Sequence, residues 1–198
     1  MGSGVVASLV GGLLCLLVAA VLGWAMIAYN RLVRRRNQVQ ASWAQIDVQL
    51  SRRHDLIPNL VETVKGYAAH ERDALTAVSA ARSGALAAAT TPGVTGRAGA
   101  EIVLTEAVGR LLALAEGYPD LRADQNFAAL QAELARTEDR IAYARQFYNS
   151  AVQTYNTTVQ SVPTNLIAGA AGFRTRDYFE AGPGERGAVG VGFPGGGT

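Results

Sequence analysis

The first thirty residues of this 198-residue chain contain no charged side chain. All 18 basic and all 16 acidic residues follow Asn30, at a density that is ordinary for a soluble domain. This uneven distribution excludes a simple cytosolic globule and a multi-span transporter. It predicts a hydrophobic anchor over residues 1–30 and one domain of ordinary size over residues 31–181.

The apolar run from Val5 to Tyr29 has the length of a transmembrane helix. At about 1.5 Å per residue its 25 residues reach roughly 37 Å, and a hydrocarbon core is about 30 Å thick. Trp24 and Tyr29 fall near its C-terminal end, where aromatic rings prefer the membrane interface. We therefore expect an uncleaved span with the lipid bilayer as its partner.

Two other N-terminal signals fit less well. A cleaved signal peptide has a basic n-region and a shorter apolar stretch, and this chain has neither. A lipoprotein anchor at Cys15 is disfavoured because Gly12-Leu13-Leu14 differs from the usual Leu-x-small triplet. Since Cys15 is the only cysteine and lies within the predicted span, no intramolecular disulfide is possible.

A basic cluster follows the span directly: Arg31, Arg34, Arg35 and Arg36. The positive-inside rule then predicts a single-pass protein of the inner, cytoplasmic membrane, with its N-terminus outside and its domain in the cytoplasm. Such arginines gain about 1 kcal/mol each near anionic headgroups, or they serve as a topology signal alone. Nucleic-acid binding is disfavoured, because acidic residues outnumber basic ones after residue 53.

The rest of the chain has helical periodicity and no alternating strand pattern. Apolar residues recur every three or four positions over residues 39–50, 57–78, 102–115 and 127–155. The last segment is the most regular, with Phe127, Leu130, Leu134, Thr137, Ile141, Ala144, Tyr148, Ala151 and Tyr155 on one stripe. We expect an all-α protein in which the transmembrane helix leads into an antiparallel, up-and-down four-helix bundle.

The first break between the expected helices is ambiguous. Asp55 can cap a new helix and Pro58 suits its first turn, which favours a tight turn at Ser51–Asp55. However, the apolar spacing continues in phase from Val39 to Tyr67, so one kinked helix is the alternative. We prefer the turn because four antiparallel segments can bury their stripes on one another.

The later breaks have clearer causes. We expect a loop over residues 90–99 and a helix end at Gly117–Asp120, because the residue before a proline avoids helical dihedrals. Asp124 is a candidate cap for the last long helix, and Pro163 ends it. Residues 182–198 contain eight glycines and two prolines, which is typical of a flexible tail.

Several motifs together resemble the LemA family, over about residues 29–180. They are Tyr29-Asn30, RRHDLIPNLVETVKGYAAHE (52–71), EGYPDLRADQNFAALQAELARTEDRIAYARQFYNSAV (116–152), Tyr155-Asn156, Pro163, Asn165, Ile167-Ala168, Gly172-Phe173 and Tyr178-Phe179. The resemblance implies a bacterial, membrane-anchored four-helix bundle of bromodomain-like topology. It brings no established activity and no agreed catalytic or cofactor residues. Some members are associated with internal membranes, and family genes often neighbour those of membrane proteases.

Signals for catalysis or cofactor binding are weak. His70-Glu71 begins a zinc-protease motif, but the second histidine is replaced by Ala74. The sequence has no Gly-x-Ser-x-Gly, and its glycine-rich tail neither follows a strand nor precedes a helix, as a phosphate loop does. We therefore expect no metal, no cofactor and no enzymatic activity.

Polar residues lie beside or within the apolar stripes: Glu62, Glu71, Arg82, Glu138, Arg145, Asn149 and Asn156. We expect them to form a structural network that fixes the register of the helices. A recognition face or shallow ligand groove is the alternative, and catalysis by these carboxylates comes third because no cleft is indicated.

Two expected turns combine proline with Asn, Asp or aromatic residues: Asp55, Pro58 and Asn59 in one, and Tyr118, Pro119 and Asp120 in the other. In an up-and-down bundle both lie at the membrane-distal end. They are either structural stops or a surface where a partner docks.

The leading functional hypothesis is a non-enzymatic scaffold or adaptor in membrane organisation, bound to protein partners or to further copies of itself. The first alternative is an accessory or substrate-adaptor subunit of a membrane protease or signalling complex. An enzyme of unknown type is the third option.

Overall fold

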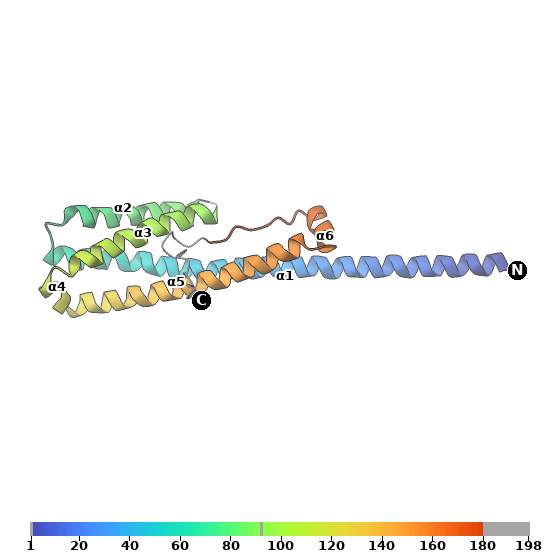
Figure 1. Cartoon of the computed structure of the whole chain (residues 1–198), viewed down its shortest axis with the longest axis horizontal. Coiled ribbons are helices and arrows are strands. Elements are labelled where there is room, and N and C mark those ends of the chain that lie inside the picture. The colour runs from blue at the N-terminus through green and yellow to red at the C-terminus, as the bar shows by residue number, and fades with distance from the viewer. Residues whose placement is uncertain (1, 92, 180–198) are drawn as a thin grey trace, which may run out of the picture. The chain divides into compact units, whose positions relative to one another are not determined.

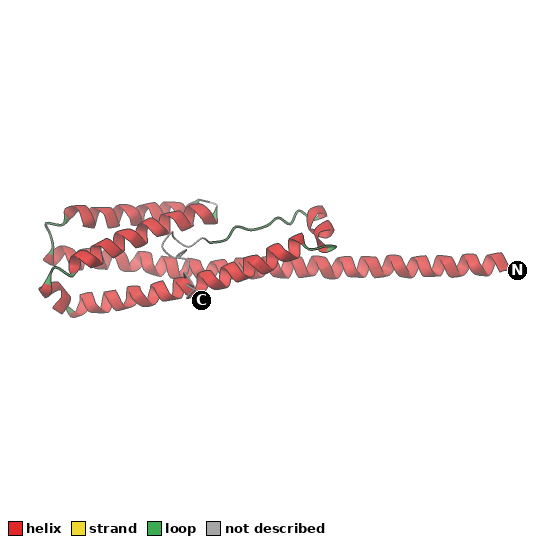
Figure 2. Ribbon diagram, in the orientation of Figure 1, coloured by secondary structure: helices red, strands yellow, loops and turns green. Residues whose placement is uncertain are grey.

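The computed structural model describes residues 2–91 and 93–179, and the regular structure of these residues is entirely helical (Figure 2). Six helices follow one another: α1 (Gly2–Tyr67), α2 (Arg72–Thr90), α3 (Val94–Ala115), α4 (Pro119–Ala123), α5 (Gln125–Gln160) and α6 (Thr164–Ala170) (Figure 1). The all-helical class and the long apolar N-terminal helix are confirmed. The four-helix, up-and-down arrangement stays a prediction. The expected tail at residues 182–198 lies outside the described residues.

The predicted turn at Ser51–Asp55 is wrong. Helix α1 continues through it for 66 residues, and Pro58 lies inside the helix. Proline lacks the N–H that would bond the carbonyl four residues earlier, which here is that of His54. The Nε atom of Arg82 donates to this carbonyl at 2.8 Å. A side chain from α2 therefore satisfies the group that Pro58 leaves open, and the helix does not end.

The first turn of the chain lies further on than expected. Helix α1 ends at Tyr67 and α2 begins at Arg72, so the predicted 57–78 segment belongs to two helices. Later ends agree better with expectation. The backbone N–H of Phe127 donates to Asp124 Oδ1 at 2.9 Å, which confirms the cap, and α5 ends before Pro163. The loop expected over residues 90–99 is shorter, because α3 already begins at Val94.

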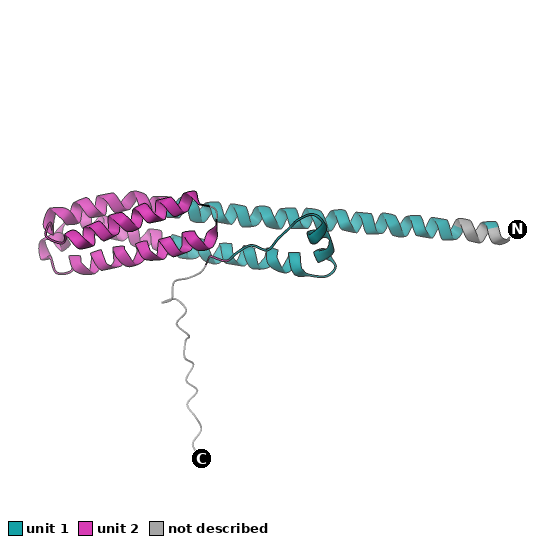
Figure 3. Cartoon of the chain, turned by 90° about the horizontal axis from the view of Figure 1, so that it is seen from above, with its two compact units in different colours: residues 1–50, 139–177 teal, residues 51–138, 178–198 magenta. Residues whose placement is uncertain are grey.

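The chain divides into two compact units (Figure 3). Unit 1 comprises residues 1–50 and 139–177, and unit 2 comprises residues 51–138 and 178–198. In unit 1 the first part of α1 and the last part of α5 share a core, in which the rings of Trp43 and Tyr148 meet edge to face at 5.4 Å. The fully buried side chains of this core are Leu32, Ile46, Leu50, Val152 and Tyr155.

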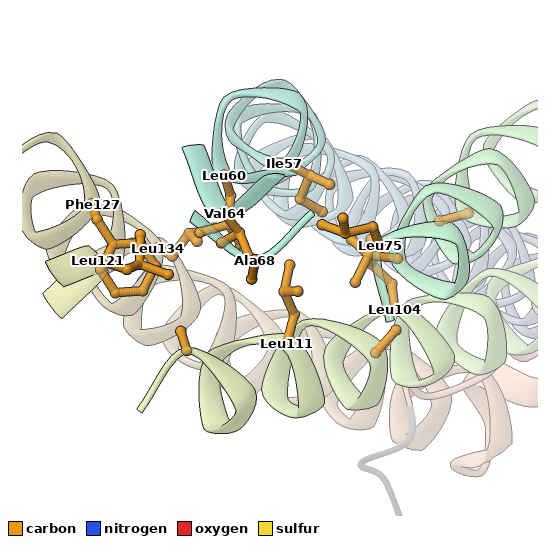
Figure 4. Packing of buried hydrophobic residues seen from close by; sticks show 14 residues of the cluster. Ile57, Leu60, Val64, Ala68, Leu75, Leu104, Leu111, Leu121, Phe127 and Leu134 are labelled. Carbon is orange, nitrogen blue, oxygen red and sulfur yellow. The ribbon is translucent and has the colours of Figure 1, made fainter. Parts of the chain in front are cut away.

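Unit 2 has its own hydrophobic core, to which five helices contribute (Figure 4). Its buried members are Ile57, Leu60, Val64 and Ala68 of α1 and the turn after it, Leu75, Val78 and Ala85 of α2, Leu104, Ala107, Leu111 and Ala115 of α3, Leu121 of α4, and Phe127 and Leu134 of α5. Helices α2 and α3 pack side by side. The apolar residues that recur every three or four positions within α1 and α5 therefore do lie on the buried faces of these helices.

Helix α1 also contains an apolar stretch that is long enough, by length and composition, to cross a membrane. None of that stretch is buried. Large apolar side chains are exposed along it from Leu9 to Ile27, whereas Ala28 and Leu32 are buried. The change from exposed to buried apolar positions thus occurs within one helix of unit 1, close to the first charged residue.

Candidate functional site

Unit 2 buries a cluster of charged side chains between α1, α3 and α5. Arg53 and His54 of α1 and Glu101 of α3 are each less than 5% exposed. Arg53 forms an ion pair with Glu101, and its Nη1 lies 2.8 Å from Glu138 Oε1. Nη1 also donates to the Thr105 hydroxyl at 2.8 Å. Buried charges are stable only when paired in this way, so the cluster connects three helices through specific contacts.

The charge state of Glu101 follows from its neighbours. Burial alone raises the pKa of its carboxyl, but the hydrogen bond from His54 and the charge of Arg53 outweigh burial and hold the pKa below its ordinary value. An ionised carboxylate only accepts hydrogen bonds, so His54 Nε2, 3.0 Å from Oε1, carries the proton. The cluster therefore links α1, α3 and α5 of unit 2 through paired charges.

Two aromatic hydroxyls join the turns of unit 2. The Tyr118 hydroxyl donates to Glu71 Oε1 at 3.0 Å, and the Tyr67 hydroxyl donates to Asp124 Oδ2 at 3.0 Å. Both hydrogen bonds raise the pKa of the tyrosine concerned. The bond from the Phe127 N–H, followed by that from Tyr67, lowers the pKa of Asp124. These contacts bring the turn at residues 68–71 close to the segment around α4.

The predicted pair of docking turns is corrected accordingly. Asp55, Pro58 and Asn59 are exposed residues within α1 and form no turn. Tyr118 and Pro119–Asp120 do lie at a turn, between α3 and α4. The turn that lies beside Tyr118 is the one at residues 68–71, because the Tyr118 hydroxyl donates to Glu71 in that turn. The sequence did not indicate this turn. Partner binding at either set of residues stays a prediction.

The predicted polar residues occupy varied positions. Glu71, Arg82 and Glu138 make the contacts between elements described above. Glu62 is exposed and pairs with Lys65 on its own helix at 3.5 Å. Arg145 and Asn149 are half-buried on the unit 1 part of α5. Arg53 and Glu101 were absent from the predicted network, because a charged residue on an apolar stripe gives no sign of its distant partner.

In unit 1 the segment after α6 is held against α5 by three side chains. Tyr155 donates its hydroxyl to the Arg174 carbonyl and Tyr148 donates to the Asp177 carbonyl, both at 2.9 Å. Asn156 bonds both backbone groups of Arg176. We call residues 174–177 the C-terminal strap. Three residues of α5, including the predicted Asn156, therefore form hydrogen bonds with the backbone of the strap.

An open groove of about 580 Å³ lies between α1 and α5 in unit 1. It is lined by Ala44, Gln45, Val48, Gln49, Asp139, Arg140, Tyr143 and Ala144. Val48 and Tyr143 are 63% and 73% exposed, so the groove presents apolar surface to its occupant. Gln49 Oε1 is buried and has no hydrogen-bond partner within the described residues. The groove can thus take an apolar side chain.

Metal binding has no support in the described part of the chain. Among residues 2–91 and 93–179, no group of three or more His, Cys, Asp or Glu side chains is placed to hold an ion. His70 and Glu71 lie in the turn between α1 and α2, where Glu71 bonds Tyr118.

Comparisons with known proteins found one matching family model and several similar proteins. The model of the LemA family matches residues 42–193. Magnetosome proteins MamQ 1 and MamQ 2 of Paramagnetospirillum magneticum are each 29% identical over 189 residues, covering 84% of this chain and 70% of the relative. Magnetosome protein MamQ of Magnetospirillum gryphiswaldense is 28% identical over 181 residues, covering 80% of this chain and 66% of the relative.

Proposed function

Because this chain belongs to the LemA family, we propose that it is a single-span membrane protein whose helical domain acts as a non-enzymatic scaffold or adaptor. Its N-terminus lies outside and its domain lies in the cytoplasm, since the arginine cluster at residues 31–36 directly follows the span. Its relatives in two bacteria are named magnetosome proteins, and we extend to this chain a role in such an assembly.

The continuity of α1 carries this proposal. Exposed apolar residues up to Ile27 and buried residues from Ala28 onward lie on one helix of unit 1, without a linker between them. An anchor that is continuous with the packed helix holds unit 1 at a fixed height and orientation on the membrane. A scaffold needs such fixed placement, whereas a flexible tether would suit an enzyme that samples diffusing substrates.

We assign the groove between α1 and α5 to contact with a second copy of the chain. Asp139 and Arg140 lie next to each other along it, and in a two-fold contact the acid of one copy meets the base of the other. Confinement of both copies to one membrane raises their effective concentration.

Native mass in detergent tests the scaffold proposal. We expect the wild-type chain to assemble, as measured by light scattering after size-exclusion chromatography. The double variant Val48→Asp, Tyr143→Asp should reduce the mass, because it places acids in an apolar contact. Val103→Asp is the control, since Val103 is 53% exposed on α3 of unit 2. A wild-type chain that is strictly monomeric would contradict the proposal.

Reporter fusions test the orientation separately. We expect green fluorescent protein fused behind the C-terminal residue to fluoresce in cells, and alkaline phosphatase at the same place to be inactive. An active phosphatase fusion would place the C-terminus outside and overturn the assigned topology.

A further inference from the structure

Two large apolar side chains are exposed where the chain passes from α5 into α6. Val162, in the turn between the helices, is 81% exposed, and Leu166 in α6 is 70% exposed. Over residues 9–91 and 93–179, no other large apolar side chain is more exposed than Val162. Exposed apolar side chains that lie together indicate a surface that another phase or molecule covers.

Contacts with α1 locate this surface within unit 1. The ring of Phe173, just after α6, meets the Tyr29 ring edge to face at 5.7 Å, and the Arg36 guanidinium lies 5.3 Å from the Phe173 ring centre. Figures 1 and 3 both show α6 beside α1. Gly172, at φ 72°, ends α6 in the left-handed conformation, and the Phe173 N–H donates to the Ala168 carbonyl at 2.9 Å. This cap directs Phe173 onto α1.

The depth of these contacts follows from helix geometry. The uncharged residues from Val5 to Trp24 number twenty, which at about 1.5 Å each extend about 30 Å and fill a hydrocarbon core. Tyr29 comes five residues later, roughly 7 Å further along α1 and still before the first charge at Arg31. Residues that pack on Tyr29 therefore lie at the level of the lipid headgroups when Val5–Trp24 spans the membrane.

The charges nearest these contacts in the sequence are positive, and the first acidic residues beyond them are Asp47 and Asp177. Over residues 1–46, and again over residues 140–176, the sequence contains no Asp or Glu. The exposed arginines near the contact are Arg31, Arg34, Arg36, Arg174 and Arg176. A surface that combines exposed apolar side chains with several arginines matches the interfacial region of an anionic bilayer.

We propose that residues 161–173, which we call the membrane foot, lie in the headgroup layer of the bilayer. Val162 and Leu166 enter the boundary of the acyl chains, and the surrounding arginines contact anionic headgroups. This inference rests on the proposed span. A lipid surface fits better than a protein partner, because the foot packs on the helix that continues into the apolar run and lies among arginines. The domain is then attached to the membrane at two places, α1 and the foot.

Depth-dependent quenching tests this proposal on the full chain. Single cysteines at positions 162 and 166, in a Cys15→Ser background, carry an environment-sensitive NBD label in liposomes that contain anionic phosphatidylglycerol. A cysteine at position 17, within the apolar run, is the positive reference. A cysteine at position 48 is the negative control, because Val48 is an exposed apolar residue of unit 1 that lies about 28 Å along α1 from Tyr29.

We expect doxyl-labelled lipids to quench positions 162 and 166 at least about twofold more than position 48, since an interfacial segment lies within about 5–10 Å of the acyl boundary. Quenching at position 17 with none at 162 and 166 would overturn the foot and leave the span intact. Absence of quenching at position 17 would overturn the span and the foot together.

Lipid composition provides a second test. In liposomes of zwitterionic phosphatidylcholine, quenching at position 166 should fall while quenching at position 17 is unchanged. Arg174→Gln with Arg176→Gln should produce the same selective fall in anionic liposomes, because their backbone contacts with α5 do not need the guanidinium groups. Equal quenching in all these samples would contradict the role of the arginines.

Discussion

The side-chain amide of Asn156 pairs with both backbone groups of Arg176. Its Nδ2 donates to the Arg176 carbonyl at 2.9 Å, and its Oδ1 accepts from the Arg176 N–H at 2.8 Å. A neighbouring strand satisfies an extended segment in the same two-bond manner. Together with the hydroxyl bonds of Tyr148 and Tyr155, this pairing holds the C-terminal strap on α5 without a β-sheet.

Removal of this amide should release the strap. We expect Asn156→Ala to lower the free energy of unfolding by about 1–2 kcal/mol, because each net hydrogen bond contributes about 1 kcal/mol. Asn156→Asp keeps the acceptor for the Arg176 N–H but sets a carboxylate oxygen against the Arg176 carbonyl, so it should destabilise the chain at least as much at neutral pH. Denaturant titration in detergent measures both, and hydrogen exchange of the Arg176 amide should accelerate. Gln153→Ala, an exposed position on the same helix, is the control. Equal loss in Gln153→Ala would contradict a specific role for Asn156.

Two glycines in and after α6 should respond in opposite directions to alanine. Gly172 has φ 72°, so Gly172→Ala should destabilise the chain by about 1–2 kcal/mol because of Cβ strain. Gly169 has open space for a Cβ atom inside the helix, so Gly169→Ala should stabilise it by about 0.5–1 kcal/mol. Thermal unfolding in detergent measures both. A stabilising Gly172→Ala would show that the left-handed cap does not hold α6.

The pairing of Pro58 with Arg82 predicts a coupled mutant cycle. Arg82→Ala should destabilise unit 2 by about 1–3 kcal/mol, because the His54 carbonyl loses its donor. In a Pro58→Ala background the new backbone N–H reaches the same carbonyl, so Arg82→Ala should cost less by about 1 kcal/mol. Chemical denaturation of the four proteins gives the coupling. Arg72→Ala, exposed on the same helix, should show none.

The buried Glu101 predicts a pH dependence of stability. Its pKa is lower in the folded chain than in the unfolded chain, so its contribution is present above the unfolded pKa and is lost as pH falls through the folded pKa. Glu101→Gln should cost about 3–5 kcal/mol at pH 7, because it removes one partner of a buried ion pair. The same variant should lose less stability than wild type on acidification below about pH 4.

Denaturant titrations from about pH 7 to about pH 3 measure this difference. The control is Glu106→Gln, because Glu106 is exposed on the same helix and its change should leave the pH profile as in wild type. Parallel profiles for Glu101→Gln and wild type would mean that the buried pair does not govern acid stability.

Local features of the fold could be predicted because neighbouring residues determine them. The stripe of Ile57, Leu60 and Val64 is buried as its spacing indicates, and Asp124 caps α5 through a bond to Phe127, three residues away. A hydrophobic period or a cap needs only residues within one or two helical turns. The helical class could therefore be read from the chain without knowledge of its packing.

The contacts of the candidate site could not be predicted from the sequence. Arg53 and Glu101 are 48 residues apart, and nothing in the sequence near either residue indicates the other. Asn156 was identified as a polar residue of interest, but its role with the backbone of Arg176 depends on where the chain after α6 returns to α5. Such contacts are properties of the folded backbone.

Sequence alone determined that this chain has an uncharged, membrane-length N-terminal run and helices with defined apolar faces, because these depend on composition and periodicity. Tertiary structure decided that α1 does not turn at Ser51–Asp55. Pro58 leaves the His54 carbonyl without its helical donor, and only the arrival of Arg82 from α2 satisfies it. The same residues would favour a helix end if that side chain were not in place.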